Sequence, residues 1–243
     1  MTYEELCKQL EPYIQLPETF GEDLRKYHHT SRPSAKMIIN SSLIEDEPKR
    51  LTEVYYCEKG WFKKAHDEGG MKLMLAANAL GLIHGEFYRY DKNKYNQICE
   101  IARCMEDEVV DSLCKAYAKQ KVITCRALSA IRKNRQEIIL YRGLSFESYD
   151  GNSEKIYFNG LESYTSALQV AEYFAGNNGW IIRRKCSIFD IFVYYTTLYR
   201  TNKIPTPETK YKIHKVREYI VENTVPIMML SDELKIYRRG CYE

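Results

Sequence analysis

The segment Ile138-Ile139-Leu140-Tyr141-Arg142-Gly143 marks the point at which the character of this chain changes. It is an apolar run that ends in an arginine and a glycine, which is typical of a strand whose end meets a turn or a ligand. Before residue 135 the spacing of apolar residues indicates helices, and after it β-branched and aromatic residues dominate. The sequence therefore predicts an α+β protein with a helical N-terminal region, residues 1–135, and a β-rich region, residues 136–243.

Three helices are expected in the N-terminal region. Apolar residues recur at steps of three and four over residues 95–117, which predicts one long amphipathic helix. Separate helices are expected over residues 122–131 and 71–83, the latter ending near Gly85. In the first sixty residues, Leu16-Pro17-Glu18 and Arg32-Pro33-Ser34 indicate breaks between short helices, and no comparably clear pattern follows.

Six strands are expected after residue 135, and all of them are rich in β-branched or aromatic residues. They cover residues 137–141, 155–158, 180–186, 191–198, 218–222 and 234–237. One helix interrupts them, because Ser166-Ala167-Leu168-Gln169 has the S-x-x-Q form of a capping box. Gly176 is expected to end that helix.

Composition excludes several classes of protein. The 243 residues are 44% hydrophobic and 28% charged, enough for a packed core, and the net charge of +3 gives no overall nucleic-acid signature. The acidic N-terminus lacks the apolar segment of a secretory signal, and no run of about 18 apolar residues suggests a membrane span. Eight cysteines without a CxxC pair indicate reduced thiols rather than a zinc site. We therefore expect a cytoplasmic protein without a membrane partner.

Three polar groups stand beside β-like runs. The Arg142 guanidinium, followed by a glycine, can bind phosphate oxygens, although a surface arginine in a turn fits the same pattern. Ser163 and Thr165 alternate on a short extended segment, so both hydroxyls face one side and could orient a carboxylate and contact a ribose. Glu218 opens a strand, where a carboxylate can bind a ribose 2′-hydroxyl and stabilise an oxocarbenium-like transition state. Each residue alone also fits an exposed strand end.

In this order, the segments resemble the Arg-Ser-Glu class of mono-ADP-ribosyltransferases, which includes bacterial toxins and antiphage effectors. The matching segments are Leu140-Tyr141-Arg142-Gly143, Ser163-Tyr164-Thr165 leading into Val170-Ala171-Glu172-Tyr173-Phe174-Ala175-Gly176, and Arg217-Glu218-Tyr219-Ile220-Val221. The resemblance covers roughly residues 136–240. It implies a split, mixed β-sheet, NAD bound between its strands as a substrate, and no metal.

The resemblance also implies a role for each matching residue. Arg142 would bind the NAD phosphates and the nicotinamide ribose, and the backbone of Gly143 would meet the carboxamide. Ser163 corresponds to the first residue of the family's Ser-Thr-Ser motif and would position the catalytic glutamate, Glu218. Phe174 matches an aromatic residue that stacks on nicotinamide in these folds, and a core position fits it equally well.

The acceptor is less well defined. Arginine-modifying members carry a glutamate two residues before the catalytic one, where this chain has Val216, so arginine modification is disfavoured. In the family, the segment before the catalytic glutamate recognises the target. Residues 199–217 here hold six basic residues against one acidic residue, with tyrosines between them. Basic charge attracts phosphates, and tyrosines stack on unpaired bases. We therefore expect a nucleic acid acceptor, RNA first, contacted by Lys210, Tyr211, Lys212 and Arg217.

Several alternatives stay open. The chain could modify a protein side chain other than arginine, hydrolyse NAD with water as acceptor, or bind NAD or RNA without catalysis. A basic loop that binds an acidic protein or nothing fits the same residues, and Glu208, His214 and Glu222 are further candidates for acceptor contact. The helical region could cover the NAD site, recognise the acceptor, or bind an antitoxin or another regulatory protein.

Overall fold

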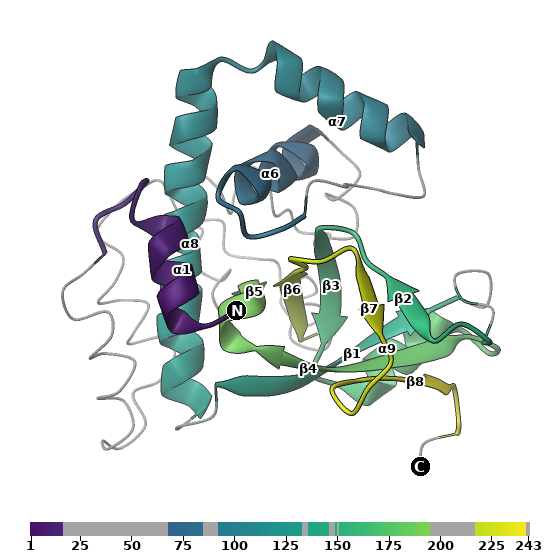
Figure 1. Ribbon diagram of the computed structural model, residues 1–243. Coiled ribbons are helices and arrows are strands. Elements are labelled where there is room, and N and C mark those ends of the chain that lie inside the picture. The colour runs from purple at the N-terminus through teal and green to yellow at the C-terminus, as the bar shows by residue number, and fades with distance from the viewer. Residues whose placement is uncertain are drawn as a thin grey trace, which may run out of the picture.

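The computed structural model describes residues 1–16, 68–84, 92–132, 136–145, 149, 151–194 and 217–241 (Figure 1). Helices come first in the chain, and strands follow, which confirms the expected α+β class. The helices of the N-terminal region are α1 (Tyr3–Leu10), α6 (Glu68–Ala79), α7 (Lys92–Cys104) and α8 (Asp107–Arg132). The remaining elements are β1 (Glu137–Leu144), β2 (Lys155–Tyr157), β3 (Leu161–Thr165), α9 (Leu168–Ala175), β4 (Trp180–Ser187), β5 (Ile191–Tyr194), β6 (Glu218–Glu222), β7 (Ile227–Met229) and β8 (Leu234–Arg238).

Six of the strands form one sheet in the order β5-β6-β3-β1-β4-β8, and β2 pairs with β7 in a second, two-stranded sheet. Every pairing among the described strands is antiparallel, so the expected mixture of parallel and antiparallel strands is not observed. The join between β1 and β3 consists of a single opposed pair, Tyr141 and Thr165. The sheet is therefore split there, and Figure 1 shows β3 and β6 steeply inclined to β1, β4 and β8.

The long helix expected over residues 95–117 is two helices. Helix α7 ends at Cys104 and α8 begins at Asp107, and α8 runs on to Arg132, so the separate helix expected over residues 122–131 is part of it. Asp107 and Glu108 lie in the first turn of α8, where negative charge favours a helix N-terminus. Apolar spacing continues across the break because both helices bury residues in the same core.

Two capping patterns gave opposite results. The bounds of helix α1 were not predicted, yet Thr2 and Glu5 form a complete capping box, in which the Glu5 backbone N–H donates to the Thr2 hydroxyl over 3.2 Å. Ser166, by contrast, does not cap α9, which begins one residue later with Ala167 at its N-cap. The hydroxyl of Thr165 accepts the Ala167 backbone N–H over 3.1 Å instead. Gly176 ends α9 with a φ of 69°, as expected.

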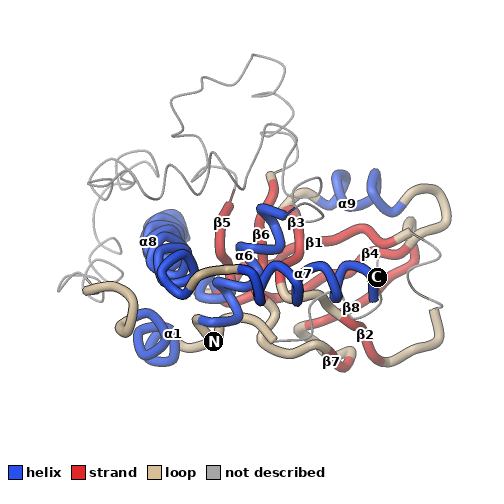
Figure 2. The backbone as a smooth tube through the Cα atoms, turned by 90° about the horizontal axis from the view of Figure 1, so that it is seen from above, coloured by secondary structure: helices blue, strands red, loops and turns tan. Residues whose placement is uncertain are grey.

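One apolar core joins the helices to the sheet. Leu6 of α1, Met74 of α6, Tyr117 of α8, Leu140 of β1 and Ile220 of β6 all belong to it. Helix α8 lies along β5, and α9 lies on the opposite side of β1 and β4 from β2 and β7 (Figure 2). None of the helices in the described ranges is long and apolar enough to cross a membrane.

Replacing Gly143 by alanine should displace α9 and destabilise the fold. A Cβ at this position would lie 2.1 Å from the Ala171 carbonyl oxygen and 2.5 Å from the Ala175 backbone nitrogen. Because both are backbone atoms, the helix must move as a unit, and we expect a loss of about 3 kcal/mol in the free energy of unfolding, measured by urea denaturation.

Gly240→Ala is the comparison variant for this prediction. Gly240 has a φ of 85°, and a Cβ there meets nothing within 4 Å, so it carries only the cost of a left-handed backbone, about 1 kcal/mol. If Gly143→Ala and Gly240→Ala lose the same free energy of unfolding, the close packing of α9 on β1 does not explain the glycine at position 143.

Candidate active site

Three residues expected to act together are linked by hydrogen bonds. Ser163 lies on β3, between β1 and β6, and its hydroxyl donates to Oε1 of Glu218 at the start of β6. Arg142 on β1 donates from Nη1 to the backbone carbonyl oxygen of the same serine over 2.9 Å. Residues that are far apart in the sequence therefore meet at the split between β1 and β3.

The two hydrogen bonds reach Ser163 from opposite faces of the sheet. Thr165 opposes both Glu218 and Tyr141, so the hydroxyls of Ser163 and Thr165 share a face with the Glu218 carboxylate. Arg142 follows Tyr141 and therefore projects to the other face, where its guanidinium lies 5.9 Å from the centre of the Tyr164 ring. Arg142 thus binds the backbone of β3 from the face of the sheet opposite the Ser163 hydroxyl.

Arg142 also faces a buried carboxylate. Its Nη2 lies 3.6 Å from Oε1 of Glu162, which accepts the Asn159 backbone N–H over 3.2 Å. Burial raises the pKa of Glu162, and the charge of Arg142 and the Asn159 N–H partly offset that rise. The second oxygen, Oε2, is buried and has no hydrogen-bond partner among the described residues. Much of the guanidinium is therefore engaged by the protein's own acceptors.

The other residues expected to contact NAD lie close to this point. Thr165 is buried and orients the turn into α9, as described above. Gly143 allows α9 to approach β1, so the protein's own packing accounts for the glycine. Phe174 on α9 is 54% exposed and contacts Tyr173 edge to face, with ring centres 5.5 Å apart. Of the two interpretations of Phe174, the core position is therefore wrong.

Of Lys210, Tyr211, Lys212 and Arg217, only Arg217 lies within the described ranges. It is exposed, directly precedes Glu218, and has a φ of 47°, a left-handed conformation that is uncommon for arginine. Such strained positions gather at functional sites. Lys210, Tyr211 and Lys212 lie outside the described residues, as do Val216, Glu208 and His214.

Glu222 is not available to an acceptor, contrary to its place among the candidates. It is buried at the far end of β6, where Oε1 accepts the Tyr117 hydroxyl over 2.8 Å and Oε2 pairs with the Lys121 ammonium. Sequence reasoning missed Lys121. Its position was visible in the pattern, because Tyr117, Lys121 and Cys125 follow at steps of four and all three are buried.

The basic run Arg183-Arg184-Lys185 has three different environments. It lies on β4, between β1 and β8, and therefore not at an edge of the sheet. Arg184 is buried and donates to Oδ1 of Asn223, and Lys185 pairs with Glu137 over 2.8 Å. The side chain of Arg183 forms no hydrogen bond or ion pair with any described residue.

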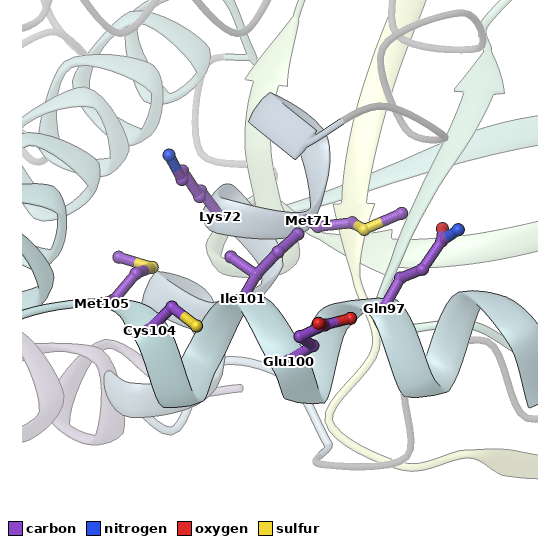
Figure 3. Close-up of a pocket in the computed structure, with 7 residues that line it drawn as sticks. All are labelled: Met71, Lys72, Gln97, Glu100, Ile101, Cys104 and Met105. Atoms are coloured by element: carbon purple, nitrogen blue, oxygen red, sulfur yellow. The ribbon is translucent and has the colours of Figure 1, made fainter.

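A pocket of about 450 Å³ lies elsewhere, between α6 and α7 (Figure 3). Its lining contains no residue of the strands, and it consists of Met71, Lys72, Gln97, Glu100, Ile101, Cys104 and Met105. This pocket is therefore separate from the Ser163–Glu218 pair. Within the described ranges, no group of three or more His, Cys, Asp or Glu side chains could hold a metal ion.

Comparisons of the chain with models of protein families, with curated proteins and with solved structures find no match.

Proposed function

We propose that this protein is an NAD-dependent mono-ADP-ribosyltransferase of the Arg-Ser-Glu class. The observation that carries the proposal is the hydrogen bond from the Ser163 hydroxyl to the Glu218 carboxylate, with Arg142 bound to the carbonyl of the same serine. Three polar residues from separate strands meet at the split in the sheet, in the order that the resemblance requires.

The chemistry follows from the orientation of Glu218. A carboxylate held by a serine hydroxyl can accept a hydrogen bond from the 2′-hydroxyl of the nicotinamide ribose and stabilise positive charge that develops at the anomeric carbon. The glycosidic bond breaks, and its electron pair leaves with nicotinamide. A nucleophile of the acceptor then forms a bond to the anomeric carbon and loses its proton. The reaction needs no metal.

For the acceptor, we propose nucleic acid, with RNA favoured. The support is the basic, tyrosine-containing segment before β6, whose last residue, Arg217, is exposed beside Glu218. By analogy with the family, the protein would act as a toxin or antiphage effector inside a cell, and a neutralising protein would be a natural partner.

Labelling tests this proposal directly. The purified protein is incubated with a cell lysate and NAD labelled in its adenylate half, and the products are then treated with nuclease or with protease. We expect label on a macromolecule that nuclease digestion removes and protease leaves, together with free nicotinamide.

Each other outcome points to a different function. Label that only protease removes would mean a protein acceptor. Consumption of NAD without labelled macromolecule would mean hydrolysis. NAD that stays intact with every acceptor would contradict the enzyme proposal and favour a module that binds NAD or RNA without catalysis.

A further inference from the structure

A single row of side chains crosses five strands of the sheet and begins at Glu218. In the strand register Glu218 opposes Thr165, Thr165 opposes Tyr141, Tyr141 opposes Arg183, and Arg183 opposes Lys235. Directly opposed residues of antiparallel strands project from the same face. Since strands are about 4.8 Å apart, Arg183 lies no more than about 15 Å from Glu218 along the sheet.

Helix α9 packs on the adjacent row, and Tyr141 of this row packs against the same apolar cluster. Gly143 opposes Ile181, and α9 packs on both of them through Ala171 and Ala175. Arg183 stands one step further along β4 and is half-buried. Its guanidinium therefore lies beside the helix, on the face that carries the Ser163–Glu218 pair.

Arg183 differs from the two lysines that lie near it on this face, Lys185 and Lys235. Lys185, two residues along the same strand, pairs with Glu137 and lies 3.7 Å from Glu233. Lys235 lies 3.3 Å from the exposed carboxylate of Asp232. The Arg183 side chain has no ionic or hydrogen-bond partner among the described residues. A half-buried guanidinium without a partner is suited to a phosphate ligand, because its fork of donors matches two phosphate oxygens.

The resemblance implies that Arg142 binds the NAD phosphates, but Arg142 is less well positioned for this role than Arg183. The Arg142 side chain projects to the opposite face, where the Ser163 carbonyl and the Glu162 carboxylate engage it. A dinucleotide whose nicotinamide ribose meets Glu218 lies on the face of Ser163 and Thr165, and its phosphates need a cation on that same face.

We propose that Arg183 binds the diphosphate of NAD, so that the dinucleotide crosses the sheet along the row from Glu218 toward Lys235. This inference rests on the proposed function, and it gives Arg142 the separate task of holding β3. The negative charge of the diphosphate complements the Arg183 cation, and no carboxylate stands between Thr165 and Arg183 in the row.

Calorimetry with fragments of the dinucleotide tests the proposal on the full chain. ADP carries the diphosphate without nicotinamide, and nicotinamide riboside carries the reacting end without phosphate. We expect Arg183→Ala to weaken ADP binding by about 10- to 100-fold and to leave nicotinamide riboside unchanged, since hydrogen bonds to charged groups are of that strength. Arg183→Lys, which keeps the charge and loses the fork, should give an intermediate loss.

Arg238→Ala is the matched control. Arg238 is an exposed arginine at the end of β8 that opposes Trp180 and therefore lies on the other face of the sheet. The Arg238→Ala variant should bind ADP as tightly as the wild type does. Unchanged circular dichroism and melting temperature would show that Arg183→Ala and Arg238→Ala both fold. In turnover assays Arg183→Ala should raise KM for NAD far more than it lowers kcat.

The outcomes separate this inference from the proposed function. If the wild type binds ADP and Arg183→Ala binds it equally well, the phosphate assignment is overturned and the enzyme proposal stands. If Arg183→Ala weakens binding of a single-stranded oligonucleotide but not of ADP, the assignment is also overturned, and the phosphate belongs to the acceptor. If the wild type neither binds ADP nor consumes NAD, the proposed function fails and the inference with it.

Discussion

Glu218→Gln should abolish NAD cleavage, lowering kcat by about 10³-fold, without loss of the fold. The amide has nearly the volume of the carboxylate and keeps a carbonyl oxygen that can accept the Ser163 hydroxyl, so the packing of β6 against β3 is retained. What it lacks is the negative charge that stabilises a cationic ribose in the transition state. Nicotinamide release under single-turnover conditions measures the chemical step alone.

Two further variants make this prediction specific. Glu137→Gln makes the same change at an exposed carboxylate of β1 and should keep wild-type activity. Ser163→Ala removes only the group that orients the carboxylate, and we expect a loss of roughly tenfold, in line with the loss of one hydrogen bond. In the Glu218→Gln background the serine substitution should cost little more, because it acts through the same carboxylate. A Glu218→Gln enzyme within tenfold of wild type would remove Glu218 from the chemistry.

Most strands were predictable because their signal is local, whereas β3 was expected only as a short extended segment around Ser163 and Thr165. The runs that became β1, β4 and β6 are rich in β-branched and aromatic residues, and their expected bounds agree with the observed ones to within three residues. The break between α7 and α8 was not predictable in this way, because the apolar spacing continues through it. Short β7, with three residues, carries too little pattern to stand out.

The pairing register of β1, β3 and β6 determines which side chains meet at the site. This register depends on contacts between residues that are far apart in the sequence. Ser163 and Glu218 are 55 positions apart, and only the resemblance suggested that they meet. That Arg142 and Ser163 project to opposite faces depends on the single opposed pair Tyr141–Thr165, because a shift by one residue would reverse every side chain of β1 relative to β3. The alignment of Arg183 with Glu218 also follows from strand register, so it could not be predicted from the sequence.

The second large effect is expected in the buried ion pair between α8 and β6. Lys121 is fully buried and pairs with Glu222, which also accepts the Tyr117 hydroxyl. Burial raises the pKa of Glu222, and the Lys121 charge and the two hydrogen bonds partly offset that rise. Lys121→Met keeps the length of the side chain and removes the charge, which leaves a buried carboxylate without its cation. We expect a loss of 3–5 kcal/mol in the free energy of unfolding at neutral pH, roughly the cost of breaking a buried pair.

The pH dependence of that loss identifies its cause. Without Lys121 the folded-state pKa of Glu222 rises further above its unfolded value of about 4.3. A raised pKa means that the folded protein binds the proton more tightly, so the variant is most stable below the unfolded pKa and loses stability as pH rises through the folded one. Urea denaturation between pH 4 and pH 8 should therefore show a gap between variant and wild type that widens with pH.

Adding Glu222→Gln to Lys121→Met should close most of that gap, because the amide still accepts the Tyr117 hydroxyl and carries no charge to desolvate. The double variant should also lose the steep dependence on pH. A gap that stays constant from pH 4 to pH 8 would mean that packing, rather than the buried charge, sets the cost. Since β6 carries Glu222 at one end and Glu218 at the other, the variant that unpairs Glu222 should lose nicotinamide release most at high pH, where α8 anchors the strand least.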